Sequence, residues 1–152
     1  MQFKAIVLGL DGSELSDRAI PVAQELVQRD GGRIEVVHVR ELMVGRAGGY
    51  PVNPDEDERE AKVRRQVEEL NSAGTKATMR LVTTATHGPA HAIAEVAEDV
   101  HADLIAVGTR GHAPVAGLLL GSVTQRLLHI SPCPVLAVPP PHTGNVKCQA
   151  ST

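Results

Sequence analysis

Short apolar runs alternate along the chain with longer stretches in which apolar residues recur every three or four positions. The runs are aliphatic or β-branched and are ended by polar residues or glycines, which is typical of buried strands. The longer stretches have the period of helices that bury one face. We therefore predict strands over 3–10, 33–39, 75–84, 103–107 and 135–138, and helices over 14–30, 55–73, 88–100 and 122–130.

This alternation of strand and helix predicts an α/β fold: a single-domain, open, five-stranded parallel sheet with helices on both faces. Two features interrupt the pattern. Pro21 falls inside the first helical stretch and predicts either a kink or a late helix start. Residues 41–54 contain three glycines and two prolines, and we expect them to form a long mobile loop.

The composition predicts one domain over 1–139 and a disordered tail over 140–152. The 152 residues suffice for one hydrophobic core but leave no room for a second domain. The hydrophobic fraction is 42%, but the chain has one Tyr, one Phe and no Trp, so the core must consist of aliphatic side chains. Such a core suits strands that are buried on both faces.

Charge and hydropathy exclude several classes of partner. The formal net charge of −3 and the scarcity of aromatic rings argue against nucleic-acid binding. No apolar run approaches the roughly 20 residues that cross a bilayer, and the N-terminal run is too short for a secretion signal. Cys133 and Cys148 fit neither a zinc site nor a disulfide framework. We expect a soluble, cytoplasmic protein with reduced thiols and no membrane contact.

Candidate chemistry follows the first and fourth predicted strands, where an open parallel sheet binds its ligands. Residues 11–13, Asp-Gly-Ser, come directly after the first strand. Residues 108–123 follow the fourth strand with the spacing G-x2-G-x9-G-S. This second segment predicts a phosphate-binding loop that leads into the N-terminus of a helix.

Each residue type in the spaced segment has a physical use. Gly108 and Gly111 allow the backbone to approach an anion closely, and neighbouring amides can form an anion-binding nest. Gly121 and Ser122 open a helix whose unpaired N–H groups and dipole favour phosphate. Arg110 is placed to reach a terminal phosphate. On its own the segment therefore predicts an anion site that suits a phosphate group, and Asp11 with the end of the second strand makes an adenine nucleotide plausible.

Two widespread nucleotide motifs are absent. The chain contains no G-x4-G-K-[ST], and hence no P-loop lysine, and the turn after its first strand does not follow G-x-G-x-x-G. Rapid phosphoryl transfer needs a positioned base and concentrated positive charge, and the sequence reveals neither. We therefore expect a nucleotide that is held more than it is turned over.

These motifs resemble the universal stress protein family over residues 3–139. The likeness is carried by LGLDGS at 8–13, VVHV at 36–39, DLIAVGTRG at 103–111, LLLGSVTQRLL at 118–128 and SPCPVLAV at 131–138. The G-x2-G-x9-G-[ST] spacing is similar to that of the family's ATP-binding branch. The resemblance implies a Rossmann-like strand order 3-2-1-4-5, bound ATP with Mg²⁺ or Mn²⁺ on its phosphates, and a homodimer through the last strand, Val135, Leu136, Ala137 and Val138.

The resemblance also implies roles for individual residues. Asp11 and Val39 would meet the adenine, and Gly9 would lie beneath it. The ribose and phosphates would be wrapped by Gly108, Thr109, Arg110 and Gly111. The phosphate chain would accept hydrogen bonds from the amides of Gly121, Ser122 and Val123.

Alternatives remain open. Asp11 also suits the capping of a local turn, Val39 the strand core, and Arg110 a solvated surface. His87 and His91 are four residues apart, but no third metal ligand accompanies them in the sequence. The favoured function is a nucleotide-binding regulatory module in the stress response. The alternatives are a slow ATPase or phosphotransferase, and a regulator that binds AMP or cyclic AMP.

Overall fold

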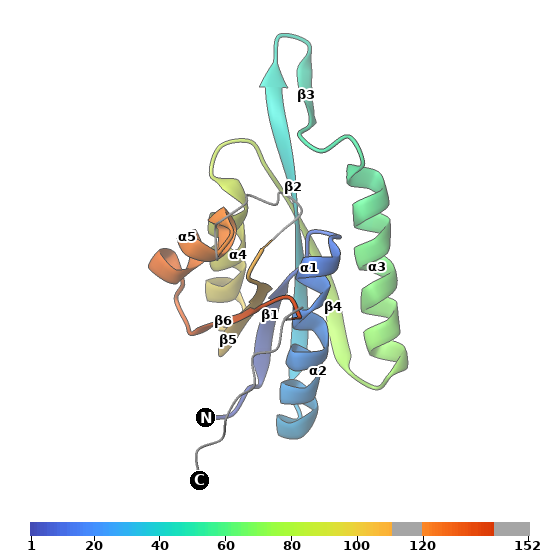
Figure 1. Ribbon diagram of the computed structural model, residues 1–152, viewed down its shortest axis with the longest axis vertical. Helices are drawn as coiled ribbons and strands as arrows, with labels where there is room; N and C mark the ends of the chain where they lie inside the picture. The colour runs from blue at the N-terminus through green and yellow to red at the C-terminus, as the bar shows by residue number, and fades with distance from the viewer. Residues whose placement is uncertain (111–119, 142–152) are drawn as a thin grey trace.

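The computed structural model describes residues 1–110 and 120–141 of the chain. Within them, strands and helices alternate almost as the sequence predicts (Figure 1). The elements are β1 (Ala5–Gly9), α1 (Glu14–Asp17), α2 (Ala19–Asp30), β2 (Arg33–Gly45), β3 (Gly48–Pro51), α3 (Glu56–Ser72), β4 (Lys76–Thr84), α4 (Gly88–Asp99), β5 (Leu104–Gly108), α5 (Ser122–Ile130) and β6 (Val135–Val138).

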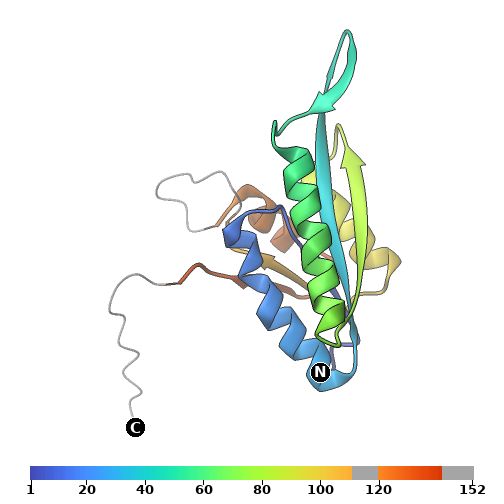
Figure 2. The same ribbon diagram turned by 90° about the vertical axis from the view of Figure 1, so that its right-hand side faces the viewer.

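Five parallel strands pair in the order β4-β2-β1-β5-β6. Figure 2 shows β4 at one edge of the sheet, beside β2. The predicted α/β fold with an open parallel sheet is confirmed, and the structure differs from the prediction by the additional strand β3. Every residue of β1 and β5 is buried, which explains why these two strands are unbroken apolar runs.

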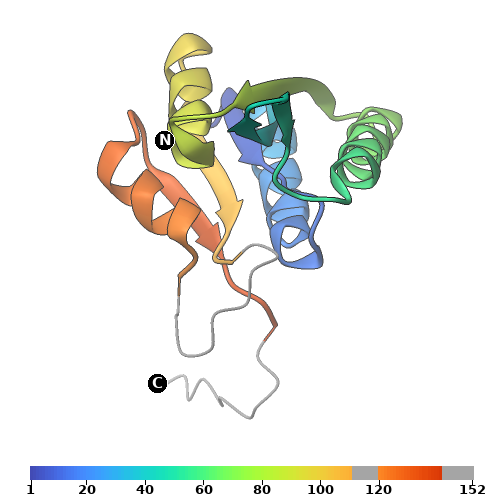
Figure 3. The same cartoon turned by 90° about the horizontal axis from the view of Figure 1, so that it is seen from above.

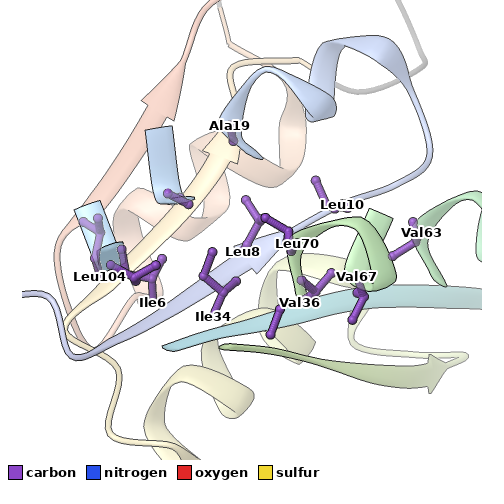
Figure 4. Close-up of a cluster of buried hydrophobic side chains, with 14 residues drawn as sticks. Ile6, Leu8, Leu10, Ala19, Ile34, Val36, Val63, Val67, Leu70 and Leu104 are labelled. Atoms are coloured by element: carbon purple, nitrogen blue, oxygen red, sulfur yellow. The ribbon is translucent and has the colours of Figure 1, made fainter. Parts of the chain in front are cut away.

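Helices cover both faces of the sheet (Figure 3). On one face, Ile6 and Leu8 of β1 pack in a cluster with Val67 of α3 and with residues of α2 (Figure 4). On the other face, Val7 of β1 packs in a second cluster with Ile93 of α4 and with a leucine of α5. Successive residues of β1 therefore face opposite helix layers, as the pleat of a strand requires.

The segment 41–54 is not the long loop that its glycines and prolines predicted. β2 continues through it to Gly45, and β3 returns antiparallel, with Leu42 opposite Pro51. Gly48, with φ of 114°, adopts a turn conformation that L side chains avoid. The apolar run before the turn pairs as a strand, and the hairpin projects beyond the body of the sheet (Figure 1).

Pro21 marks a late helix start. α1 ends at Asp17 and α2 begins at Ala19, so Pro21 lies in the first turn of α2. A proline in that turn removes no helical hydrogen bond, because the first N–H groups of a helix have no partner within it. At the other end of α2, Gly31 has a left-handed φ of 67° and caps the helix.

Two predictions about partners concern the last strand and the helices: the dimer through β6 and the lack of membrane contact. β6 lies at the edge of the sheet beyond β5, and its residues Val135–Val138 are half-buried. The homodimer through this strand stays a prediction. Across 1–110 and 120–141, no helix is both long and apolar enough to cross a membrane.

Candidate functional site

A cavity of about 250 Å³ lies at the carboxyl ends of β1, β2 and β5. β1 pairs with β2 on one side and with β5 on the other, so the strand order reverses here. Open parallel sheets bind ligands at this switch point. Most of the predicted site residues line the cavity, namely Gly9, Asp11, Val39, Gly108, Arg110, Gly121, Ser122 and Val123.

The α5 end of the cavity has the features of an anion site. Gly121 precedes the helix in extended backbone, with φ of −70° and ψ of 161°, and as a glycine it has no side chain that could cap the first turn. Ser122 and Val123, the first helical residues, line the cavity. Amides in the first turn of a helix have no partner within it and attract anions together with the helix dipole. This end of the cavity is therefore suited to a phosphate group.

Hydrogen bonds fix the start of α5 to the end of β5. The Gly121 amide donates to the Thr109 carbonyl oxygen at 2.6 Å, and the Thr124 hydroxyl donates to the Gly108 carbonyl oxygen at 2.9 Å. The Thr109 amide in turn donates to the Val138 carbonyl oxygen of β6 at 3.0 Å. Thr109, a predicted site residue, is therefore a backbone anchor of this region rather than a residue that lines the cavity.

Arg110 is half-buried and lines the same cavity. Its Nε atom is buried and has no hydrogen-bond partner among the residues that the structure describes. A buried guanidinium donor is satisfied well by an anionic oxygen acceptor. The partial burial of Arg110 argues against its interpretation as an ordinary solvated surface charge.

An apolar wall at the sheet completes the cavity. It includes Val37 and Val39 of β2, Ile93 of α4 and Val107 of β5. A Cβ atom on Gly9 would lie 3.0 Å from Val107 Cγ1 and 3.1 Å from Ile93 Cδ1, so a larger residue at position 9 would crowd this wall. Apolar side chains with a few polar groups are the usual surroundings of a bound aromatic base.

Asp11 has a local role and also lines the cavity. One carboxylate oxygen accepts hydrogen bonds from the Ser13 amide at 2.9 Å and from the Ser13 hydroxyl at 2.5 Å. Ser13 in turn caps α1 by accepting from the Ser16 amide at 3.2 Å. The turn-capping interpretation of Asp11 is therefore correct, and it does not conflict with a ligand contact from the same residue.

Six polar residues that line the cavity were not assigned to the site from the sequence: Ser16, His38, Glu41, Asn53, Glu56 and Thr124. His38 lies in β2, within the strand predicted over 33–39, and both of its ring nitrogens have partners. Its Nδ1 lies 2.8 Å from the Leu10 carbonyl oxygen and its Nε2 lies 2.5 Å from Glu56 Oε1. Glu41 and Asn53 lie at the root of the hairpin, which the sequence predicted to be a loop, and Glu56 is the first residue of α3. Their place at the cavity depends on the pairing of the hairpin and on the docking of α3.

The sequence model of the universal stress protein family matches residues 2–139. The chain belongs to the universal stress protein family. A universal stress protein of Thermus aquaticus is 37% identical over 139 residues, which cover 90% of this chain and 98% of the relative. Universal stress protein YxiE of Bacillus subtilis is 32% identical over 146 residues, with 90% and 99% covered.

Solved structures share the fold. A universal stress protein in complex with cAMP has a TM-score of 0.66 and 29% identity, with 91% of this chain and 98% of that chain covered. A universal stress protein from Archaeoglobus fulgidus in complex with dAMP has a TM-score of 0.66 and covers 91% of this chain and 99% of its own. At 19% identity, this second likeness concerns the fold alone.

In this universal stress protein, the structure describes only part of the glycine signature. Gly108, Gly121 and Ser122 line the cavity, whereas Gly111 lies outside the described residues. No cluster of three or more His, Cys, Asp or Glu side chains able to hold a metal occurs within 1–110 and 120–141. The rings of His87 and His91 lie 6.2 Å apart between centroids, and that pair alone is not such a cluster.

Proposed function

We propose that this universal stress protein binds an adenine nucleotide, with ATP as the leading ligand, and acts as a regulatory module in the stress response. The observation that carries the proposal is the first turn of α5, which begins after the glycine Gly121 and lines a cavity at the switch point of the sheet. Arg110 adds a cation to this cavity, and the apolar wall suits a base. The cAMP complex of a 29% identical family member supports the ligand class.

The charges around the cavity favour binding over hydrolysis. Arg110 is the one Arg or Lys among the described residues that line it, whereas Asp11, Glu41 and Glu56 contribute carboxylates. Phosphoryl transfer is accelerated by positive charge on the transferred group, by a metal ion and by a positioned nucleophile. We therefore propose at most a slow ATPase, with Mg²⁺ or Mn²⁺ entering on the phosphates of the nucleotide.

The choice among ATP, AMP and cyclic AMP is decided by binding experiments. Backbone amides bind a phosphate group whether or not further phosphates follow it. Mass spectrometry of small molecules released from the purified protein is expected to find an adenine nucleotide. Calorimetric titration is expected to rank ATP above AMP and cyclic AMP, because only ATP places additional charge within reach of Arg110.

Arg110→Ala tests the phosphate end. We expect about tenfold weaker ATP binding, because a charge-assisted hydrogen bond is lost, and a smaller effect on AMP. Arg126→Ala is the matched control, since Arg126 lies exposed on α5 and does not line the cavity. The proposal fails if no nucleotide is released and millimolar ATP with Mg²⁺ causes no thermal shift. Equal single-turnover hydrolysis by the wild type and Arg110→Ala at the background rate would exclude the ATPase.

We also propose a homodimer through the edge of β6 that faces away from β5. The amides of Ile105 and Thr109 donate to the carbonyl oxygens of Pro134 and Val138, so the backbone groups of Ala137 face away from β5. Ala137→Pro removes one outward N–H and is expected to yield a monomer in analytical ultracentrifugation. A wild-type monomer at high protein concentration would contradict the dimer.

A further inference from the structure

The ladder between β1 and β2 stops one hydrogen bond early. The Leu10 amide donates to the Val37 carbonyl oxygen at 3.0 Å, which continues the parallel register of Gly9 beside Val37. In a regular parallel ladder, the next bond joins the Val39 amide to the Leu10 carbonyl oxygen. That bond is not formed between these two described residues. The Leu10 carbonyl oxygen accepts instead from His38 Nδ1, at 2.8 Å.

Glu56 holds the His38 ring in this position. His38 Nε2 lies 2.5 Å from Glu56 Oε1, and the two residues are only 1% and 2% exposed. Because the Leu10 carbonyl oxygen can only accept, Nδ1 is the donor in this hydrogen bond. A buried pair of this kind is costly to desolvate and is weak evidence for stability. Its presence beside the cavity therefore points to a role in the site.

The edge of β2 that faces β1 is also paired further along, at the root of the hairpin. The Val52 amide donates to the Glu41 carbonyl oxygen at 2.9 Å, and the Glu56 amide donates to the Asn53 carbonyl oxygen at 3.2 Å. Val37 and Glu41 are therefore both paired along this edge of β2, and Val39 lies between them. Alternate residues of a strand direct their N–H and C=O groups to the same side, so those of Val39 point to this edge too. They face the gap that the missing bond between Val39 and Leu10 leaves in the ladder.

We propose that His38 and Glu56 are a positioning pair that keeps this gap open for a nucleobase. His38 takes the Leu10 carbonyl out of the ladder, and the freed Val39 N–H and C=O offer one donor and one acceptor side by side. A ring nitrogen next to an exocyclic amino group, as in adenine, is complementary to such an edge. The inference rests on the proposed nucleotide function and assigns the positioning of its base to a buried pair that lines the cavity.

Glu56→Ala, Glu56→Gln and the control Glu35→Gln test the proposal. Glu35 also lies on β2 and accepts from Thr78 and Arg80, but it does not line the cavity. Without nucleotide, the Val39 amide of the wild type should exchange with deuterium faster than the Val37 amide. In Glu56→Ala the released His38 should let Leu10 rejoin the ladder, slowing Val39 exchange about tenfold.

A comparison of ATP binding with tripolyphosphate binding then distinguishes an effect on the base from an effect on the phosphates. Glu56→Ala should weaken ATP binding about tenfold, since a hydrogen bond to the base is lost, and leave tripolyphosphate binding within about twofold. Glu56→Gln keeps an acceptor for His38 and should recover most of the ATP affinity, and Glu35→Gln should resemble the wild type. If Glu56→Ala does not fold, Glu56→Leu fills similar volume without an acceptor and gives the same readouts.

Two results would overturn the inference while leaving the proposed function standing. One is a similar loss of ATP and tripolyphosphate binding in Glu56→Ala, which indicates general damage. The other is unchanged ATP binding together with unchanged Val39 exchange. A wild-type protein that binds neither ATP nor tripolyphosphate overturns the proposed function, and the positioning role falls with it.

Discussion

Gly108, the last residue of β5, lies directly against the backbone of Leu15 in α1. A Cβ atom at position 108 would be 2.5 Å from the Leu15 carbonyl oxygen and 3.1 Å from its carbonyl carbon. Gly108 begins the glycine signature, and its spacing alone suggested a close approach to phosphate. The close approach that the structure contains is between two segments of the protein itself, at the edge of the cavity.

Gly108→Ala should therefore destabilise the fold even without nucleotide. Because the clashing atoms are backbone and cannot rotate away, we expect the free energy of unfolding to fall by about 1–3 kcal/mol. Urea denaturation of the nucleotide-free protein measures this. Gly49→Ala is the control: its Cβ would meet Leu42 Cδ1 at 3.4 Å, an ordinary contact, and should change stability by less than about 0.5 kcal/mol. Equal stability of Gly108→Ala and the wild type would contradict the steric account.

Asp11→Asn separates the two roles of Asp11. The asparagine oxygen can still accept from the Ser13 amide and hydroxyl, so we expect the free energy of unfolding to change by less than about 0.5 kcal/mol. Replacing the other carboxylate oxygen with an NH₂ group should weaken ATP binding about tenfold if Asp11 accepts from the adenine amino group. Calorimetric titration and urea denaturation of the same sample provide both values. An unchanged ATP affinity would leave Asp11 with turn capping alone.

The parts of the fold that could be predicted have local signals. Helix Ser122–Ile130 and strand Val135–Val138 match their predicted bounds, because apolar period and flanking glycine or proline residues define them. The hairpin after Val39 could not be predicted in this way. Glycine and proline are common both in loops and at hairpin turns, and pairing with the rest of β2 decides between them.

The candidate site also has one part that could be predicted from the sequence and one part that could not. Its phosphate end comes from one contiguous segment, so the spacing of Gly108, Gly121 and Ser122 could be recognised in the sequence. Its other end is assembled from β1, β2 and the start of α3. His38 and Glu56 are 18 residues apart, and no periodicity or motif links them. Their pairing depends on how α3 docks on the sheet, which is a tertiary property.

The low pKa of Asp30 predicts how the stability of the fold depends on pH. Its carboxylate accepts from the Arg29 guanidinium at 2.9 Å and from the Phe3 amide at 2.7 Å, and these contacts lower the pKa of Asp30 from 3.8 to about 2. Because the pKa is lower in the folded state, the ionised carboxylate stabilises the fold above about pH 4, and this stabilisation is lost as the pH falls toward 2.

Asp30→Asn should therefore lower the free energy of unfolding near neutral pH, and the difference from the wild type should shrink as the pH approaches about 2. Urea denaturation at a series of pH values measures both proteins. Glu68→Gln, on an exposed face of α3, is the control and should follow the wild type at every pH. A difference between Asp30→Asn and the wild type that is independent of pH would contradict the assignment.

The hairpin should divide functionally into an outer part and a root. Met43, Val44 and Tyr50 in the outer part are 50%, 71% and 52% exposed, so replacing residues 43–50 with Asn-Gly should change stability and ATP affinity little. Val52→Pro instead removes the amide that donates to Glu41 at the root, next to the gap at Val39. We expect Val52→Pro to weaken ATP binding about three- to tenfold while the truncated protein binds as the wild type does. Titration of both variants checks this, and a loss of affinity in the truncated protein alone would move the functional part of the hairpin to its exposed tip.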